Sequence, residues 1–118
     1  MSAQIPHLET GRYGEEMALQ YLKEKGHLVL ARNWRFGKGE LDLITRDEQF
    51  IIITEVKTRT NDKYGSPHED VNETKQALLE ETAEAYVLEN NIDLELRFDI
   101  ISIVLKPNLV IEHIEDAF

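Results

Sequence analysis

The sequence predicts one α/β domain over residues 1–118, with a mixed central sheet flanked by two helices. Apolar residues at helical spacing run through residues 9–25 and again through residues 70–90. Three β-prone runs lie between these segments, and two more follow the second segment. The predicted order is therefore an αβββαβ core with a C-terminal β-hairpin extension.

The first predicted helix has one apolar face. The residues at helical spacing on this face are Gly14, Met17, Ala18, Tyr21 and Leu22. Thr10 is the expected N-cap, and Gly26 is the expected residue just beyond the helix end. At about 100° per residue, Glu15 borders the apolar face whereas Glu16 points away from it. We therefore expect Glu15 to reach inward at the edge of the domain.

Three strands are expected between the helices, over residues 27–36, 40–45 and 50–58. A Gly-Lys-Gly turn joins the first two strands, and a polar loop joins the second and third. Side chains alternate between the two faces of a strand, so Glu55 and Lys57 lie side by side at the end of an otherwise apolar strand. A carboxylate and an ammonium group then emerge together from the core.

The hairpin between the second and third strands decides which carboxylates meet. With the hairpin tip at residues 47–48, Glu40 lies across from Glu55 and Asp42 lies across from Ile53. Asp42 is then one diagonal step from Glu55, within reach of a shared ion. A slip of two residues places Asp42 directly opposite Glu55. In both registers, acidic groups from two neighbouring strands gather at one edge of the sheet.

The second predicted helix has an apolar inner face and an acidic outer face. The inner face comprises Val71, Leu78, Leu79, Thr82, Ala83 and Tyr86. The outer face carries Glu73, Glu80 and Glu84. Lys75 falls on the inner face near the start of the helix. Two strands follow, over residues 98–105 and 109–114, with a Pro-Asn turn between them.

Composition excludes several kinds of site. The chain has no cysteine, which excludes disulfides and cysteine-based zinc sites. The four histidines are scattered along the sequence, so any metal should be a hard ion with oxygen ligands, Mg²⁺ or Mn²⁺. The first residues lack the layout of a signal peptide, and no apolar run approaches the ~18 residues of a membrane helix. We expect a cytoplasmic protein with no membrane partner.

The net charge of -10 argues against a generic nucleic-acid binder, which is usually basic. The charge is unevenly distributed along the chain. Residues 66–96 hold nine acids against Lys75 alone, whereas residues 1–65 hold ten acids and ten bases. The acidic sheet edge therefore lies in the balanced half of the chain, where basic residues also cluster.

Carboxylates beside a lysine at a strand end are typical of metal-dependent phosphodiester cleavage. A divalent ion held by the carboxylates neutralises the phosphate charge and lowers the pKa of a bound water. A neighbouring lysine stabilises the hydroxide or the charge that develops during attack. The alternative is a set of surface ion pairs among Glu40, Glu55 and Lys57, each worth about 0–1 kcal/mol.

Six segments of the chain closely resemble the uncharacterised bacterial YraN-type family. They are residues 11–22, 32–35, 39–44, 55–59, 97–101 and 113–118. The resemblance spans nearly the whole chain. That family looks like a small member of the PD-(D/E)xK restriction-endonuclease-like group, and its pattern is most similar to that of the archaeal Holliday-junction resolvases.

The resemblance implies a single endonuclease-like domain with Mg²⁺-dependent endonuclease activity on structured DNA, including branched DNA, in repair or recombination. Carried over by position, the catalytic residues are Glu15, Asp42, Glu55 and Lys57. The first three of these are also the implied metal ligands. Leu41 stands where the proline of the group would precede the aspartate, and Glu40 is then a rival metal ligand. Resolvase-like enzymes are usually symmetric dimers, so the resemblance also implies a homodimer.

Basic residues near the expected site are candidates for contacts with DNA phosphates. They are Arg12, Arg35, Lys38, Arg59 and Lys75. Trp34 and Phe36 either stack an unpaired base or pack in the core. Two other functions stay open at this point: a non-catalytic nuclease-fold binding module, and a protein-interaction adaptor that uses the acidic helix 70–90.

Overall fold

The computed structural model describes residues 7–61, 63 and 67–118, without the side chains of 7–9 and 68. Its elements are α1 (His7–Glu24), β1 (Leu28–Phe36), β2 (Gly39–Arg46), β3 (Phe50–Arg59), a 3-10 turn η1 (Pro67–Asp70), α2 (Glu73–Glu89), β4 (Glu95–Val104) and β5 (Val110–Ile114). The predicted α/β class with a mixed sheet and two helices is confirmed. The architecture is consistent with a compact restriction-endonuclease-like fold.

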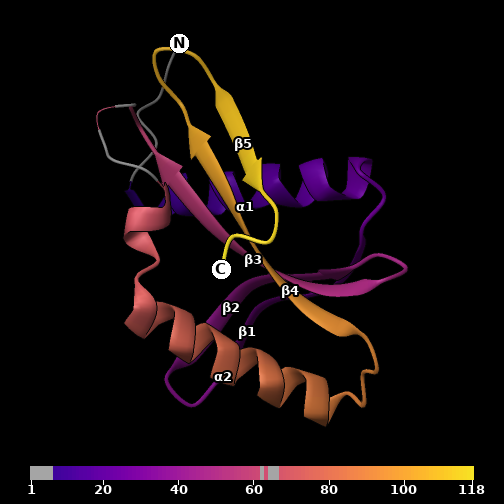
Figure 1. Cartoon of the computed structure of the whole chain (residues 1–118). Helices are drawn as coiled ribbons and strands as arrows, with labels where there is room; N and C mark the ends of the chain where they lie inside the picture. Colours follow the sequence, from indigo (N-terminus) through magenta and orange to yellow (C-terminus); the bar gives the residue numbers. More distant parts are fainter. Residues whose placement is uncertain (1–6, 62, 64–66) are drawn as a thin grey trace.

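The five strands form one sheet in the order β1-β2-β3-β4-β5. Neighbouring strands are antiparallel except β3 and β4, which are parallel from Phe50 and Glu95 to Arg59 and Val104. A parallel pair needs a crossover connection, and α2 lies within this one. Figure 1 shows α1 crossing the upper part of the sheet and α2 crossing its lower part. β5 lies beside β4 at one edge.

Each helix covers one face of the sheet and forms its own apolar core. α1 packs Ala18, Leu19 and Leu22 against a cluster that includes Ile101 and Ile103. α2 packs its buried residues Leu79, Ala83 and Tyr86 against a cluster that includes Ile51, Ile53, Phe98 and Ile100. Because β4 supplies Ile100 to one cluster and Ile101 to the other, the two helices lie on opposite faces.

The limits of α1 differ from the prediction at one end only. The described helix already includes His7, so the expectation that Thr10 is the N-cap is wrong; Thr10 lies buried inside the helix. Gly26 ends the helix as predicted, with a φ of 93° that favours glycine. Its N–H donates to the Lys23 carbonyl, and the His27 N–H donates to the Leu22 carbonyl, each at 3.0 Å. These two bonds are those of a Schellman motif.

The hairpin of β2 and β3 adopts the slipped register. Leu43 pairs with Thr54 and Arg46 pairs with Ile51, so the register that sets Asp42 across from Ile53 is wrong. The reason is local: the Asp47 carboxylate accepts hydrogen bonds from the Gln49 and Phe50 N–H groups, at 2.8 and 2.7 Å. This Asx-type turn moves the hairpin tip one residue later than expected. One further step along the ladder sets Asp42 opposite Glu55.

The second helix is shorter than predicted at its start. It begins at Glu73, because the Asn72 side chain caps it by accepting the Lys75 N–H at 3.0 Å. Residues 70–72 instead form the end of η1 and the cap. The predicted inner face is buried except for Leu78, which is 36% exposed. Neither helix in the described part of the chain combines the length and apolarity needed to cross a membrane.

Candidate active site

Two carboxylates from neighbouring strands meet at the end of the β2–β3 ladder. The Asp42 Oδ2 atom accepts the Val56 N–H at 3.0 Å, which draws the side chain toward the backbone of β3. The adjacent Glu55 side chain is 8% exposed. Burial, repulsion from Glu55 and a weaker repulsion from Glu15 raise the pKa of Asp42 from 3.8 to about 8, despite the hydrogen bond from Val56. The acidic groups therefore crowd into a space with little water.

A glycine brings the third carboxylate, Glu15, toward the strands. A Cβ atom on Gly14 would collide with the Thr58 hydroxyl, so the backbone of α1 lies directly against β3 here. Glu15 follows at the next position and is half-buried, whereas Glu16 is exposed and pairs with Arg32 at 2.6 Å. The helical-angle prediction separated these two residues correctly. The close contact places Glu15 of α1 near enough to Asp42 to raise the pKa of that carboxyl group.

Two lysines complete the cluster. Lys75 of α2 places its Nζ atom 3.3 Å from Glu55 Oε1. Burial opposes its charged form, but attraction to Glu55 and hydrogen bonds to Glu55 and Lys57 outweigh it and raise the Lys75 pKa. Lys57 of β3 is affected in the opposite sense, because burial and the neighbouring ammonium of Lys75 lower its pKa. One amine is thus held as a cation while the other gives up its proton more easily than an ordinary lysine.

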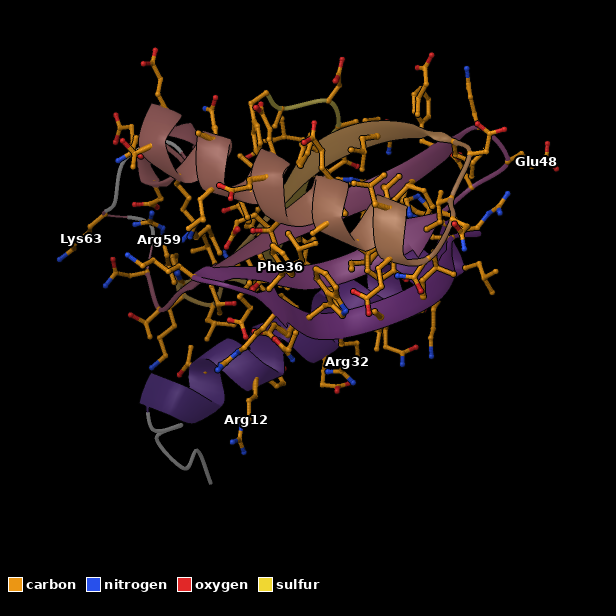
Figure 2. The ribbon with its side chains drawn as sticks, turned by 90° about the horizontal axis from the view of Figure 1, so that it is seen from below. Arg12, Arg32, Phe36, Glu48, Arg59 and Lys63 are labelled. Atoms are coloured by element: carbon orange, nitrogen blue, oxygen red, sulfur yellow. The ribbon has the colours of Figure 1, made fainter. Side chains whose placement is uncertain are left out.

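The remaining predicted residues lie outside this cluster. Glu40 pairs with Arg35 at 2.8 Å, so a cation already neutralises the carboxylate of the rival ligand. Arg59 is largely buried in an ion pair with Asp70. Lys38 and Arg12 are exposed, and Figure 2 shows Arg12 pointing outward from α1. Of the five basic candidates, only Lys75 contacts one of the clustered carboxylates among the residues described.

A second charged cluster was not predicted, because the sequence shows its histidines only as scattered residues. Asp99 is fully buried and accepts two hydrogen bonds from Arg97, one from His113 and one from the Asp116 N–H, all at 2.8–3.0 Å. Glu115 joins through Arg97 at 3.1 Å. Lys25 donates to His113 Nδ1 at 3.1 Å, which leaves the Nε2 hydrogen for Asp99. The network ties β5 and the C-terminal turn to β4.

Among the described residues, Asp99, His113 and Glu115 form the one group of three acidic or histidine side chains with all ligand atoms within 4.8 Å. A cation does not suit it, because the Arg97 guanidinium already occupies the carboxylates. Glu15, Asp42 and Glu55 do not meet that spacing together, so Glu15 is the outer member of its cluster. The Asp42–Glu55 pair is the better candidate, because Asp42 forms no ion pair among the described residues and its pKa is raised.

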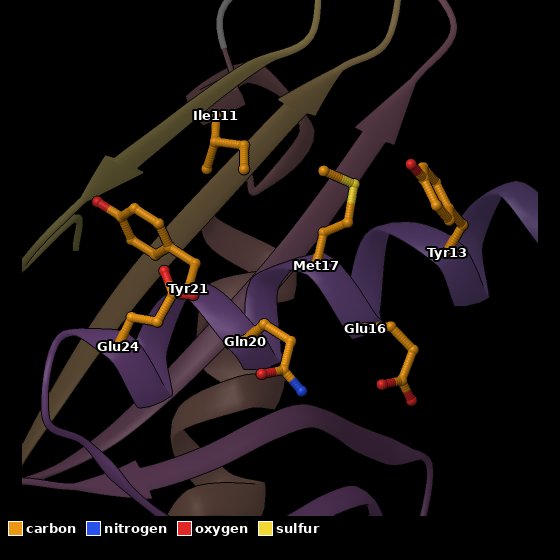
Figure 3. A pocket seen from close by; sticks show the side chains of 7 residues that line it. All are labelled: Tyr13, Glu16, Met17, Gln20, Tyr21, Glu24 and Ile111. Atoms are coloured by element: carbon orange, nitrogen blue, oxygen red, sulfur yellow. The ribbon is translucent and has the colours of Figure 1, made fainter.

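A shallow apolar groove lies elsewhere, between α1 and β5. Figure 3 shows Met17, Tyr21 and Ile111 lining its floor, with Glu16 and Glu24 among the polar residues at its border. The groove carries no lysine or arginine. Its lining includes none of the clustered carboxylates, so it is separate from the candidate active site.

The model of the uncharacterised protein family UPF0102 matches residues 14–103. The chain belongs to this family. A UPF0102 protein of Thermodesulfovibrio yellowstonii is 44% identical over 114 residues, covering 97% of this chain and 99% of its own. UPF0102 proteins of Flavobacterium psychrophilum and Phocaeicola vulgatus are each 42% identical over 113 residues, covering 95% of this chain and 95% and 93% of theirs. The predicted YraN-type family is confirmed, and the matched UPF0102 segment contains every residue of the candidate active site.

Proposed function

We propose that this UPF0102 protein is a metal-dependent nuclease that acts on structured DNA in repair or recombination. One observation carries the proposal: Asp42 and Glu55 come together from adjacent strands, with the amine of Lys57 on the same strand end. Surface ion pairs do not account for this arrangement, because Asp42 is crowded by like charges rather than paired with a cation. Such crowding is typical of a functional site.

A divalent cation fits the residues present. Burial and repulsion from Glu55 raise the Asp42 pKa, and a cation held by the two carboxylates would relieve this repulsion. The donors are carboxylate oxygens, which suit Mg²⁺ or Mn²⁺. Asp42 and Glu55 would hold the ion, with Glu15 as an outer ligand. The ion would supply charge neutralisation at the phosphate and a more acidic bound water.

The protein side chains have separate roles in this proposal. Lys57, whose pKa is lowered, holds or moves a proton beside the attacking water. Lys75 neutralises Glu55 when no ion is present and offers a fixed positive charge to a phosphate when one is. The exposed acids on the outer side of α2, among them Glu80 and Glu84, repel DNA from that surface. We therefore expect DNA to approach the clustered carboxylates from a side other than this acidic surface.

Lys57→Ala should lower the rate of Mg²⁺-dependent DNA cleavage by roughly 10²–10⁴-fold, since it removes a proton-transfer group. The measurement is cleavage of labelled branched and linear duplexes by the wild type and the variant, with Mg²⁺, Mn²⁺ or EDTA. Lys23→Ala, which removes an exposed lysine of α1, is the matched control and should cleave normally. Equal cleavage by the Lys57 variant would refute its role. DNA binding without cleavage by the wild type would favour a non-catalytic binding module.

A further inference from the structure

Two aromatic rings lie parallel at the tip of the β1–β2 hairpin. The rings of Trp34 and Phe36 have centroids 6.2 Å apart and planes inclined by 3°. They are two residues apart on one strand, so they share a face. Phe36 is 51% exposed, and Figure 2 labels it on the hairpin that lies between the ribbons of α2 and α1 in that view. We refer to these two rings as the aromatic platform.

The platform is fixed in place rather than loosely exposed. Trp34 packs edge-on against Tyr86 of α2, with centroids 5.1 Å apart at 84°, and joins the apolar core there. Gly39, at the end of the same turn, lies so close to α2 that a Cβ atom would collide with Thr82. A half-exposed phenylalanine held beside an anchored tryptophan presents apolar area to solvent without a partner in the described structure.

The platform is next to the candidate active site and is flanked by two basic residues, of which Arg35 is paired with Glu40. Trp34 pairs with Leu41, the residue before Asp42, and Phe36 pairs with Gly39. At about 3.3 Å per residue, the tip lies roughly 10 Å along β2 from Asp42. Exposed Arg35 and Lys38 project from the same hairpin tip, and no ion pair neutralises Lys38 among the described residues. Aromatic rings beside cations favour a nucleic acid strand over an apolar protein segment.

We propose that the aromatic platform stacks an unpaired nucleobase of the DNA substrate. The substrate class of the site is then DNA with splayed or unpaired nucleotides beside the cleavage point, rather than continuous duplex. A base has two flat faces that stack on aromatic rings only when it has left its own stack, so the platform discriminates by structure and not by sequence. This inference rests on the proposed nuclease function and adds the feature that selects the substrate.

Trp34 is the only tryptophan of the chain, so its fluorescence reports on the platform directly. The experiment titrates the protein in EDTA, where no cleavage occurs, with a splayed-arm DNA and with a blunt duplex of the same length and composition. Splayed-arm DNA should quench Trp34 emission and bind more tightly than the duplex. Phe36→Ala should weaken binding of the splayed-arm DNA by roughly 5- to 150-fold and leave duplex binding unchanged.

Leu28→Ala is the matched control, because Leu28 is 61% exposed at the opposite end of β1. This variant should bind both DNAs as the wild type does. Equal affinity of the wild type and the Phe36 variant for splayed-arm DNA would overturn the platform while the nuclease proposal stands. Loss of affinity for both DNAs in the Phe36 variant would also overturn it as a selector of unpaired bases. Binding of neither DNA by the wild type in EDTA would overturn the platform, whereas the cleavage assay with Mg²⁺ or Mn²⁺ decides the nuclease proposal.

Discussion

Asp42→Asn should stabilise the metal-free protein while it removes the proposed nuclease activity. The wild-type carboxyl group sits in a half-buried cluster where burial and Glu55 raise its pKa from 3.8 to about 8. At 1.36 kcal/mol per pKa unit, such a rise opposes folding at neutral pH by several kcal/mol. An amide keeps the shape of the side chain without the charge. We expect the free energy of unfolding in EDTA to increase by roughly 1–3 kcal/mol.

The sign of the pH dependence follows from the same group. Between pH 4 and pH 8 the unfolded chain releases the Asp42 proton, whereas the folded protein retains it. The wild type therefore loses stability as the pH rises through this window, and the Asp42 variant should lose less. The groups that face the carboxyl are Glu55 and Lys57 of β3, Glu15 of α1 and, through Glu55, Lys75 of α2. None of these is changed in the variant.

Urea unfolding at pH 5 and pH 8 measures both effects. Glu40→Gln is the matched control, because it removes an exposed carboxylate of the same strand and should change stability by no more than about 0.5 kcal/mol. Cleavage by the Asp42 variant should fall by at least about 10²-fold, since a proposed ligand is lost. If the Asp42 variant is less stable than the wild type at pH 8, the claim that like charges crowd around Asp42 is contradicted.

Asp99→Asn should produce the largest loss of stability. The carboxylate is fully buried and accepts four hydrogen bonds, from Arg97, His113 and Asp116. An amide cannot accept all four or neutralise the guanidinium, so the partly buried Arg97 loses its buried partner and keeps only the exposed Glu115. Removing one member of a buried pair costs about 3–5 kcal/mol. Glu115→Gln, at the exposed end of the network, should cost far less.

The pH dependence of Asp99 has the opposite sign to that of Asp42. Burial alone would raise its pKa, but hydrogen bonds from His113, Arg97 and the Asp116 N–H outweigh burial and lower it to about 2. The lowered pKa of Asp99 contributes about 2 kcal/mol to the free energy of unfolding. This contribution is complete above pH 4 and is lost as the pH falls toward 2. Acid unfolding of the wild type and the Asn variant measures it. A variant as acid-sensitive as the wild type would rule out this carboxylate as the source.

The sequence was sufficient to predict those parts of the site that lie within a single helix or strand. The helical angle separated Glu15 from Glu16, and alternation along β3 placed Glu55 and Lys57 together. The register of the hairpin was not predictable to the residue. It depends on the Asp47 side chain, whose hydrogen bonds shift the turn by one position.

Contacts between distant elements could not be predicted. Lys75 reaches Glu55 because the first turn of α2 lies over the end of β3. The spacing of these two residues along the sequence does not predict this contact. The Asp99 network draws on β4, β5 and the C-terminal turn, with Lys25 from the end of α1. The helical pattern of α2 likewise gave no sign that Leu78 would remain partly exposed.

The most direct test of the proposed metal site is X-ray diffraction from crystals soaked in Mn²⁺, recorded where manganese scatters anomalously. The proposal predicts one strong anomalous peak between the carboxylates of Asp42 and Glu55, with the Lys75 ammonium displaced from Glu55. No peak at saturating Mn²⁺, with Lys75 still paired to Glu55, would contradict it.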